Sequence, residues 1–251
     1  IGAKKEFGAI LFFAALVNFN DIPRGFLEDR YGKAVVDDLV SRLAAHSFLT
    51  DVSVKNGVKV FSIHESVQEY LFLHLGSFYS KTTQRDLAKK EVFEAFREIL
   101  EEKPGEKYTI SFPLIRVILS HCDAALKHPE FFEKKDLIVL KTFMGVRYHL
   151  MGEFTKSEKL LLEALEEGEK INDPLVVSNL FRSLGSLYTY LARAQEAKSY
   201  LKKSLELAQQ YHLKDDHKFC KGLAFLGFAH KIGGEYDMAV QYATQSLKVA
   251  E

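Results

Sequence analysis

The sequence predicts a mainly α-helical protein with one β-hairpin near its N-terminus and repeated helix pairs in its second half. Three observations support this fold class. Apolar residues recur at helical spacing through most of the 251 residues. Asn56-Gly57 separates two short alternating stretches, which is the strongest short hairpin signal because both turn positions need positive φ. From about residue 136 onward a single pattern occurs three times, which indicates stacked repeats.

The first part of the chain combines three expected helices with that hairpin. The apolar positions of the first helix are Phe7, Ile10, Leu11, Ala14 and Val17. Asn20 or Asp21 is expected to cap a second helix, which tolerates Pro23 in its first turn. The apolar positions of the third helix are Val35, Val36, Leu39, Val40, Leu43 and Ala44. The helical period returns after Ile63, so the order of elements predicts a winged-helix domain over residues 1–78.

The stretch FSIHESVQEY places a histidine where the hairpin ends and the next helix begins. Ser62 and Glu65 fit a capping box, in which each side chain satisfies a backbone N–H at the helix start. His64 is then expected in the first turn, where free N–H groups and the helix dipole favour an anion such as phosphate. Alternatively, His64 shares a face with Val67 and Leu71 and is a half-buried histidine bonded to a carbonyl.

Residues 79–135 are expected to form a helical linker. Its first helix is amphipathic, with apolar positions at Leu87, Val92, Phe93, Phe96 and Leu100. Its second helix contains the neighbours His121 and Cys122, which have no visible third partner of catalytic type and are predicted to lie in the core. Cys122 and Cys220 match no metal or redox spacing, so both are expected to be reduced thiols in a cytoplasmic protein.

The firmest signal is the internal repeat over residues 136–251, whose equivalent positions lie 40 and then 42 residues apart. The equivalent sets are Gly145, Gly185 and Gly227; Tyr148, Tyr188 and His230; Ser157, Ala197 and Ala239; and Leu165, Leu205 and Leu247. Each unit is expected to be two antiparallel helices that approach closely at the glycine and at the small residue. One unit cannot bury its apolar face alone, so the three units are expected to stack into an α-solenoid.

These positions resemble tetratricopeptide repeats, which have a Leu-Gly pair or a near variant, a tyrosine three residues later and a small residue twelve after the glycine. The ordinary period is 34 residues. The longer period here is similar to that of kinesin light chains and of regulatory ATPases. The first unit departs from the pattern at Met144 and Ser157.

The chain as a whole resembles the C-terminal part of signal-transduction ATPases of the STAND class, which includes the NB-ARC and NACHT families. The resemblance rests on DIPRGFLED, LVSRLAAHSFL and FSIHESVQEY, followed by the repeats. It implies that His64 is the histidine of an MHD-like motif, which reaches the β-phosphate of bound ADP and locks the closed state. Glu65 stands where the usual residue is Asp. Because the chain begins with Ile1, it is expected to be a piece of a longer protein with an ATPase module upstream, which would bind ADP or ATP with Mg.

No enzymatic activity and no cofactor are expected from this chain itself. It contains no G-x-x-x-x-G-K-[ST] to cradle phosphates, no metal-ligand spacing and no nucleophile elbow. The predicted function is a non-catalytic regulatory fragment. Its repeats would bind a protein, a peptide or a smaller inducer, and its winged helix would relay this event to the nucleotide switch.

Family analogy places the partner on the concave surface, which the inner helices of the repeats form. The expected inward positions are Thr142, Val146, His149, Asn179, Arg182, Ser186, Thr189, Lys221, Phe228 and Lys231. Asn, Arg and Lys side chains there are suited to a peptide backbone or a carboxylate. The alternative is an ordinary solvated face.

Two other functions remain open. A DNA-binding regulator would place its third helix in the major groove. Residues 1–78 hold eight basic and nine acidic residues, so this domain offers few basic side chains for contacts with phosphates. A plain scaffold without a nucleotide switch fits the repeats equally well.

The net charge is zero, so no nucleic-acid or membrane partner is expected, and the opening apolar run is too short to span a bilayer. The repeat half holds 15 basic and 15 acidic residues, so these counts do not predict whether its partner is acidic or basic.

Overall fold

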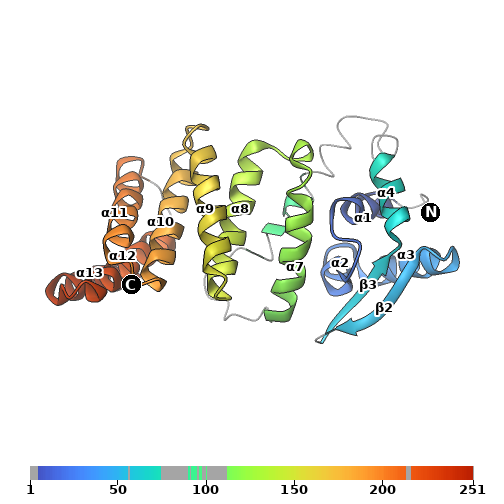
Figure 1. Ribbon diagram of the computed structural model, residues 1–251, viewed down its shortest axis with the longest axis horizontal. Helices are drawn as coiled ribbons and strands as arrows, with labels where there is room; N and C mark the ends of the chain where they lie inside the picture. The colour runs from blue at the N-terminus through green and yellow to red at the C-terminus, as the bar shows by residue number, and fades with distance from the viewer. Residues whose placement is uncertain are drawn as a thin grey trace. The chain divides into compact units, whose positions relative to one another are not determined.

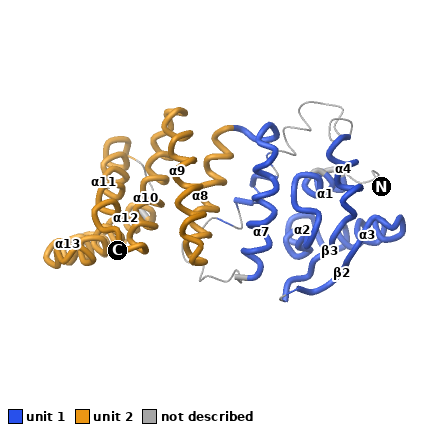
Figure 2. The backbone as a smooth tube through the Cα atoms, viewed as in Figure 1, with its two compact units in different colours: residues 1–101, 106–133 blue, residues 102–105, 134–251 orange. Residues whose placement is uncertain are grey.

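A computed structural model describes residues 5–55, 57–74, 90, 92–94, 96–97, 100, 112–212 and 216–250. The protein is mainly α-helical, with one three-stranded sheet in its first half and a region of repeated helices in its second half (Figure 1). It divides into two compact units (Figure 2). Unit 1 comprises residues 1–101 and 106–133, and unit 2 comprises residues 102–105 and 134–251.

Unit 1 combines short helices with the sheet. Its described elements are α1 (Lys5–Leu16), β1 (Ile22–Pro23), α2 (Arg24–Tyr31), α3 (Lys33–Ala45), β2 (Leu49–Lys55), β3 (Val58–Ile63), α4 (Glu65–Leu73), α7 (Phe112–Ala125) and the 3₁₀ helix η1 (Pro129–Phe131). The hairpin lies where the sequence predicts it, since Lys55 pairs with Val58 and Gly57 has a φ of 81°. Asn56 lies outside the described residues. β1 pairs with the other edge of β3, so the strand order is β1-β3-β2.

The start of α2 differs from the prediction, because neither Asn20 nor Asp21 caps it. Ile22 and Pro23 pair with β3 instead, so the helix begins only at Arg24 and its N-cap is Pro23, without a side-chain hydrogen bond. This strand was missed because two residues are too few to show an alternating pattern.

The core of unit 1 includes the five apolar positions predicted for the first helix, four in α1 and Val17 directly after it, all of which are buried. The apolar face of α3 buries fewer residues than predicted, since Ala44 is exposed and Val35 is only half-buried. In the linker, the described apolar positions Val92, Phe93, Phe96 and Leu100 are buried, as predicted, while Leu87 lies outside the described residues. The ring centroid of Phe96 lies 5.6 Å from that of Phe13 in α1, so Phe96 contributes to the core.

Unit 2 is a row of helix pairs. Its described elements are α8 (Lys134–Leu150), α9 (Phe154–Gly168), α10 (Pro174–Tyr190), α11 (Ala194–Gln210), α12 (Asp216–Ile232) and α13 (Tyr236–Ala250). α8 packs on α9, α10 on α11 and α12 on α13, and α10 also contacts both α8 and α12. We call α8, α10 and α12 the first helices, and α9, α11 and α13 the second helices. The surface that the first helices form is called the first-helix face.

The predicted close approach at the repeat glycines is confirmed in the first two repeats. A Cβ on Gly145 would lie 2.6 Å from Cγ of Leu161, and one on Gly185 would lie 2.4 Å from Cγ of Leu201. Both distances are shorter than a van der Waals contact, so a side chain at either position would force the leucine to move. Ser157, which departs from the usual alanine, donates its hydroxyl to the carbonyl oxygen of Gly145 at 2.7 Å.

The turn inside each repeat is the same. Gly152, Ala192 and Gly234 take positive φ values of 80°, 57° and 77°. The residue after each of them donates its N–H, over 2.9 Å in each case, to the carbonyl of Tyr148, Tyr188 or His230. Ala192 is the one member that adopts this left-handed conformation with a side chain, which costs an L-residue roughly 1–2 kcal/mol.

Small polar residues join the two helices of the second and third repeats. The Ser178 hydroxyl donates to the carbonyl of Ser204 at 3.0 Å, and the Ser204 hydroxyl donates to the carbonyl of Ser178 at 2.8 Å. In the third repeat, Cys220 and Ser246 make the same reciprocal pair at 3.1 and 3.0 Å. Cys220 therefore acts as a structural thiol and is not paired with Cys122.

Candidate functional site

His64 lies at the exact junction of β3 and α4, one residue before the predicted first turn. It is the N-cap residue, with extended backbone angles of −64° and 136°. Its N–H donates to the carbonyl of Phe48, and its carbonyl accepts from the N–H groups of Val67 and Gln68. The imidazole is exposed, and its Nδ1 lies 3.4 Å from the hydroxyl oxygen of Ser66. The half-buried alternative is therefore wrong, and the ring is available to a group outside unit 1.

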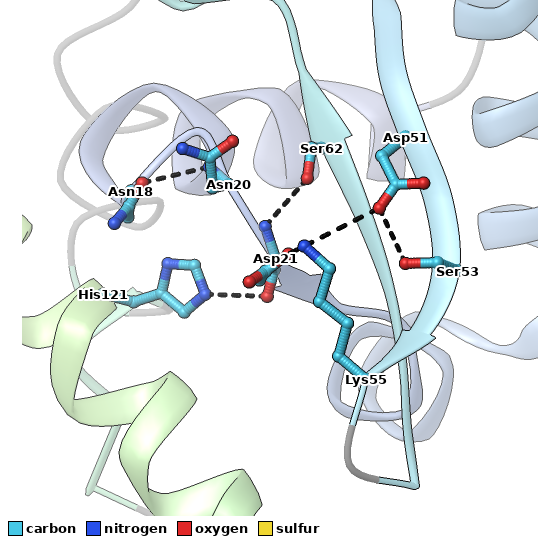
Figure 3. Close-up of polar contacts among 8 residues, drawn as sticks. All are labelled: Asn18, Asn20, Asp21, Asp51, Ser53, Lys55, Ser62 and His121. Atoms are coloured by element: carbon cyan, nitrogen blue, oxygen red, sulfur yellow. Dashed lines mark hydrogen bonds and ion pairs between the residues drawn. The ribbon is translucent and has the colours of Figure 1, made fainter.

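The predicted capping box does not form. The N-cap of α4 has no side-chain hydrogen bond. Ser62 lies on β3, only 2% exposed, and its hydroxyl oxygen accepts the N–H of Asp21 at 3.0 Å (Figure 3). Glu65 is simply the first residue of α4, where a carboxylate interacts favourably with the helix dipole. Ser62 belongs to β3, which ends at Ile63, so its side chain bonds within the sheet region instead of capping α4.

Asp21 lies between α1 and β1 and contacts three further elements of unit 1 (Figure 3). Its φ of 59° turns the chain between α1 and β1, and its N–H reaches β3 through Ser62. Its carboxylate lies 2.5 Å from Nζ of Lys55 on β2, which raises the pKa of that lysine. Its carbonyl lies 3.1 Å from Nε2 of His121 on α7. These contacts fix the segment that leads into the sheet.

His121 and Cys122 lie in the core, as predicted, and both are fully buried. A carbonyl oxygen can only accept, so Nε2 of His121 carries the proton that bonds to Asp21. Burial lowers the pKa of His121 to about 4 and raises the pKa of the Cys122 thiol well above its usual value. The ring is therefore neutral at pH 7 and the thiol is protonated. Neither group is suited to nucleophilic or acid–base chemistry.

The residues predicted for the partner-binding face differ in exposure. Thr142 and Thr189 are buried and donate their hydroxyls to the carbonyls four residues earlier in their own helices, at 2.7 and 2.8 Å. Ser186 and His149 are also buried. The half-buried members are Val146, Asn179, Arg182 and Lys221, and the exposed members are Phe228 and Lys231. The exposed and half-buried members therefore lie mostly on α10 and α12.

An aromatic row crosses the three first helices. The ring centroid of His149 on α8 lies 5.1 Å from that of Tyr190 on α10, and Tyr190 lies 6.4 Å from Phe225 on α12. Tyr190 is 55% exposed and Phe228 is 57% exposed. Sequence reasoning missed Tyr190 and Phe225, because each contact joins positions that are not equivalent in the repeat alignment.

A small hollow lies between α10, α11 and α12. Its lining surface is mostly apolar, from Leu175, Leu205, Ala208 and Phe219, and it also includes Ser178, Asn179, Arg182, Ser204 and Lys218. Asn179 and Arg182 were predicted from sequence, and Lys218 was not. The hollow thus brings together two predicted side chains and one missed cation from the next repeat.

Neither a metal site nor a membrane span is found among the residues that the structure describes. No group of three or more His, Cys, Asp or Glu side chains there is arranged to hold a metal ion. No helix in the same part of the chain combines the length and the apolar character needed to cross a bilayer.

One family model matches part of the repeat region. Residues 138–210 match the family model of the tetratricopeptide repeat. Among solved structures, BtubC (BKLC) from P. vanneervenii is similar with 15% identity and a TM-score of 0.49, over 74% of this chain and 83% of that one. A Signal Transduction ATPase with Numerous Domains (STAND) protein with a tetratricopeptide repeat sensor, from Pyrococcus horikoshii, is similar with 16% identity and a TM-score of 0.46. That match covers 98% of this chain, which spans 44% of the matched protein. None of the curated proteins matches the sequence.

Proposed function

We propose that this chain is a non-catalytic regulatory segment of a STAND-type signalling ATPase. Unit 2 binds a protein or peptide on the first-helix face, and unit 1 relays this event to a nucleotide switch elsewhere in the intact protein. The observation that carries the binding role is the repeat region itself. Residues 138–210 match the tetratricopeptide family, and exposed or half-buried side chains gather on α10 and α12.

The element order of unit 1 supports the assignment of a winged helix. A helix, a short strand and two helices precede the hairpin, and a further helix follows it. The strand order β1-β3-β2 places the first strand beside the last, as that fold requires. A domain of this kind is suited to relaying an event because β3 leads directly into His64 and α4.

His64 is the residue we assign to nucleotide sensing. Its exposed ring extends from the start of α4, where the helix dipole also favours a phosphate. The ADP and Mg themselves would be held by the ATPase module, since no phosphate-binding loop occurs in this sequence. A ligand that binds unit 2 better in the open arrangement would shift the population away from the ADP-locked one.

The sensing role is tested by His64→Ala in the intact protein, with release of labelled ADP as the readout. We expect faster release because the contact to the β-phosphate is lost. His46→Ala is the matched control, because His46 is a second exposed histidine of unit 1 and follows α3. Unchanged ADP release in the His64 variant would remove the sensing role and leave the binding role of unit 2 untouched.

The DNA-binding alternative gains little from the structure. Arg42, which lies near the end of α3, pairs with Asp38 at 2.9 Å, and Arg24 of α2 pairs with Asp37. Charges that are neutralised in this way contribute little to phosphate binding.

A further inference from the structure

The sheet of unit 1 has two edges that differ in how well they are protected. The first edge is β1, which is only two residues long and contains Pro23. Proline has no N–H to donate, so this edge is a poor template for a further strand. The second edge is β2, which is seven residues long, contains no proline and pairs only with β3 among the residues that the structure describes (Figure 1). The outer side of β2 is therefore an open edge.

The register of the hairpin shows which backbone groups lie on this open edge. Lys55 and Val58 flank a two-residue turn, so they exchange both of their backbone hydrogen bonds. Bonded and non-bonded pairs alternate along an antiparallel ladder, which places Val54 and Val52 in non-bonded pairs. The N–H and C=O groups of these two valines therefore point away from β3.

The two faces of β2 differ in polarity. Asp51, Ser53 and Lys55 share one face, where the Asp51 carboxylate accepts the Ser53 hydroxyl at 2.7 Å and lies 3.7 Å from Nζ of Lys55 (Figure 3). Val52 and Val54 alternate with them and are 52% and 63% exposed. Natural sheets usually protect such an edge with charges, proline or a covering element. This edge instead offers unpaired backbone groups together with apolar side chains.

The segment Asp51–Lys55 is self-complementary when two copies run antiparallel. Its order is acid, valine, serine, valine, base, so a pairing centred on Ser53 places Asp51 opposite Lys55 of the second copy. Val52 then lies opposite Val54 of the second copy, and each such pair exchanges both of its outward hydrogen bonds. A parallel pairing in register would instead place like charges side by side, which is destabilising.

We propose that this chain pairs with a second copy of itself through β2, antiparallel and centred on Ser53, so that the two sheets continue across a two-fold axis. Lys55 retains its contacts with Asp21 and Asp51 inside each copy, and the charges across the axis set the register more than the affinity. The assembly stops at the dimer, because the edges that remain are those with Pro23. This inference does not depend on what unit 2 binds.

An extended peptide from another protein is the other kind of strand that an open edge accepts. The symmetry of the segment favours a second copy, because pairing with an unrelated peptide does not require Asp51 and Lys55 to be placed symmetrically about Ser53. The contact is small, so we expect a weak dimer that forms as the concentration rises.

The first experiment is sedimentation equilibrium of the whole chain over a wide range of concentrations. We expect a monomer–dimer equilibrium without larger species. Val54→Pro removes an outward N–H that makes no bond to β3, so it should leave the hairpin folded and weaken the dimer by roughly tenfold or more. Val54→Thr is the matched control, because it keeps the N–H and the β-branched shape and should retain most of the dimer. Circular dichroism establishes that both variants are folded.

The second experiment tests the register by cross-linking with oxidised glutathione, in a Cys220→Ser background that leaves only the buried Cys122. Ser53 faces itself across the axis in a non-bonded pair, where Cα atoms are about 4.5 Å apart, so Ser53→Cys should give a disulfide-linked dimer on a non-reducing gel. Val52→Cys should give far less, because its counterpart lies about 7–8 Å away on the diagonal.

The outcomes decide the proposal. A wild-type chain that stays monomeric at the highest concentration overturns it and leaves the edge to a strand of another protein. A dimer that Val54→Pro does not weaken, or equal cross-linking of Ser53→Cys and Val52→Cys, overturns the assignment to β2 in this register. Species larger than a dimer overturn the closed two-fold arrangement.

Discussion

Lys198 of α11 places its Nζ 2.6 Å from Oε1 of Glu235, across the junction between the second and third repeats. One repeat earlier the equivalent positions are Glu158 and Arg193, which pair at 2.9 Å with the charges reversed. The two junctions between repeats therefore have an ion pair at equivalent positions, with the acidic and basic residues exchanged. Because the two orientations exclude each other, the pair can define which repeat follows which.

Reversing Lys198 alone should loosen this junction. Lys198→Glu places two carboxylates together at a position where the lysine is only 8% exposed, and we expect the midpoint of thermal unfolding to fall by roughly 2–4 °C. Lys198→Glu/Glu235→Arg recreates the arrangement of the second repeat and should recover most of the loss. Adding His230→Tyr completes the match, because Tyr188 donates its hydroxyl to Glu158 in the second repeat.

Circular dichroism during heating measures both effects. Lys202→Glu on the exposed side of α11 controls for the change in net charge and should leave the midpoint nearly unchanged. If the double variant unfolds at the temperature of Lys198→Glu, the pair does not join the repeats.

A second prediction concerns Ala192, which occupies the turn position that is glycine in the other two repeats. Its φ of 57° is unfavourable for a residue with a Cβ. Ala192→Gly should raise the free energy of unfolding by about 0.5–1 kcal/mol. Gly234→Ala should lower it by about 1 kcal/mol, although no atom lies within 4 Å of the added Cβ.

The midpoint of urea unfolding measures both variants. Opposite signs for the two substitutions would show that backbone conformation sets the effect, because the space around Gly234 is open. A loss of stability in Ala192→Gly would mean that the entropy of the unfolded chain outweighs the strain.

The third prediction is a pH dependence that originates at His121. Burial lowers its pKa to about 4, against about 6.5 in the unfolded chain. Only the unfolded state then binds the proton between these values. The stability is therefore complete above pH 6.5 and decreases as the pH falls towards 4. Between pH 7 and pH 5 the free energy of unfolding should fall by about 2 kcal/mol from this group alone.

His121→Gln keeps an N–H donor for the carbonyl of Asp21 and removes the titrating group. In urea unfolding, the difference between pH 7 and pH 5 should shrink by about that amount relative to the wild type. His46→Gln, at an exposed position, should retain the wild-type difference. An unchanged pH dependence in His121→Gln would mean that other groups cause it.

Features that depend on local sequence were predictable, and those that depend on distant partners were not. The positive φ of Gly57 and the close approach at Gly145 and Gly185 favour a particular residue, so the residue itself is the signal. Ser62 was misread because its partner, Asp21, is 41 residues away.

The fourth prediction distinguishes the structural role of Ser62 from the capping role that its sequence context suggests. Ser62→Ala removes the acceptor of the Asp21 N–H at a buried position and should cost about 1 kcal/mol. Glu65→Ala should change the free energy of unfolding by less than about 0.5 kcal/mol, because Glu65 caps no backbone group in α4. Urea unfolding of the two variants under identical conditions measures the contrast. A capping box would instead give similar losses for both, since each side chain would then satisfy one N–H of the same helix start.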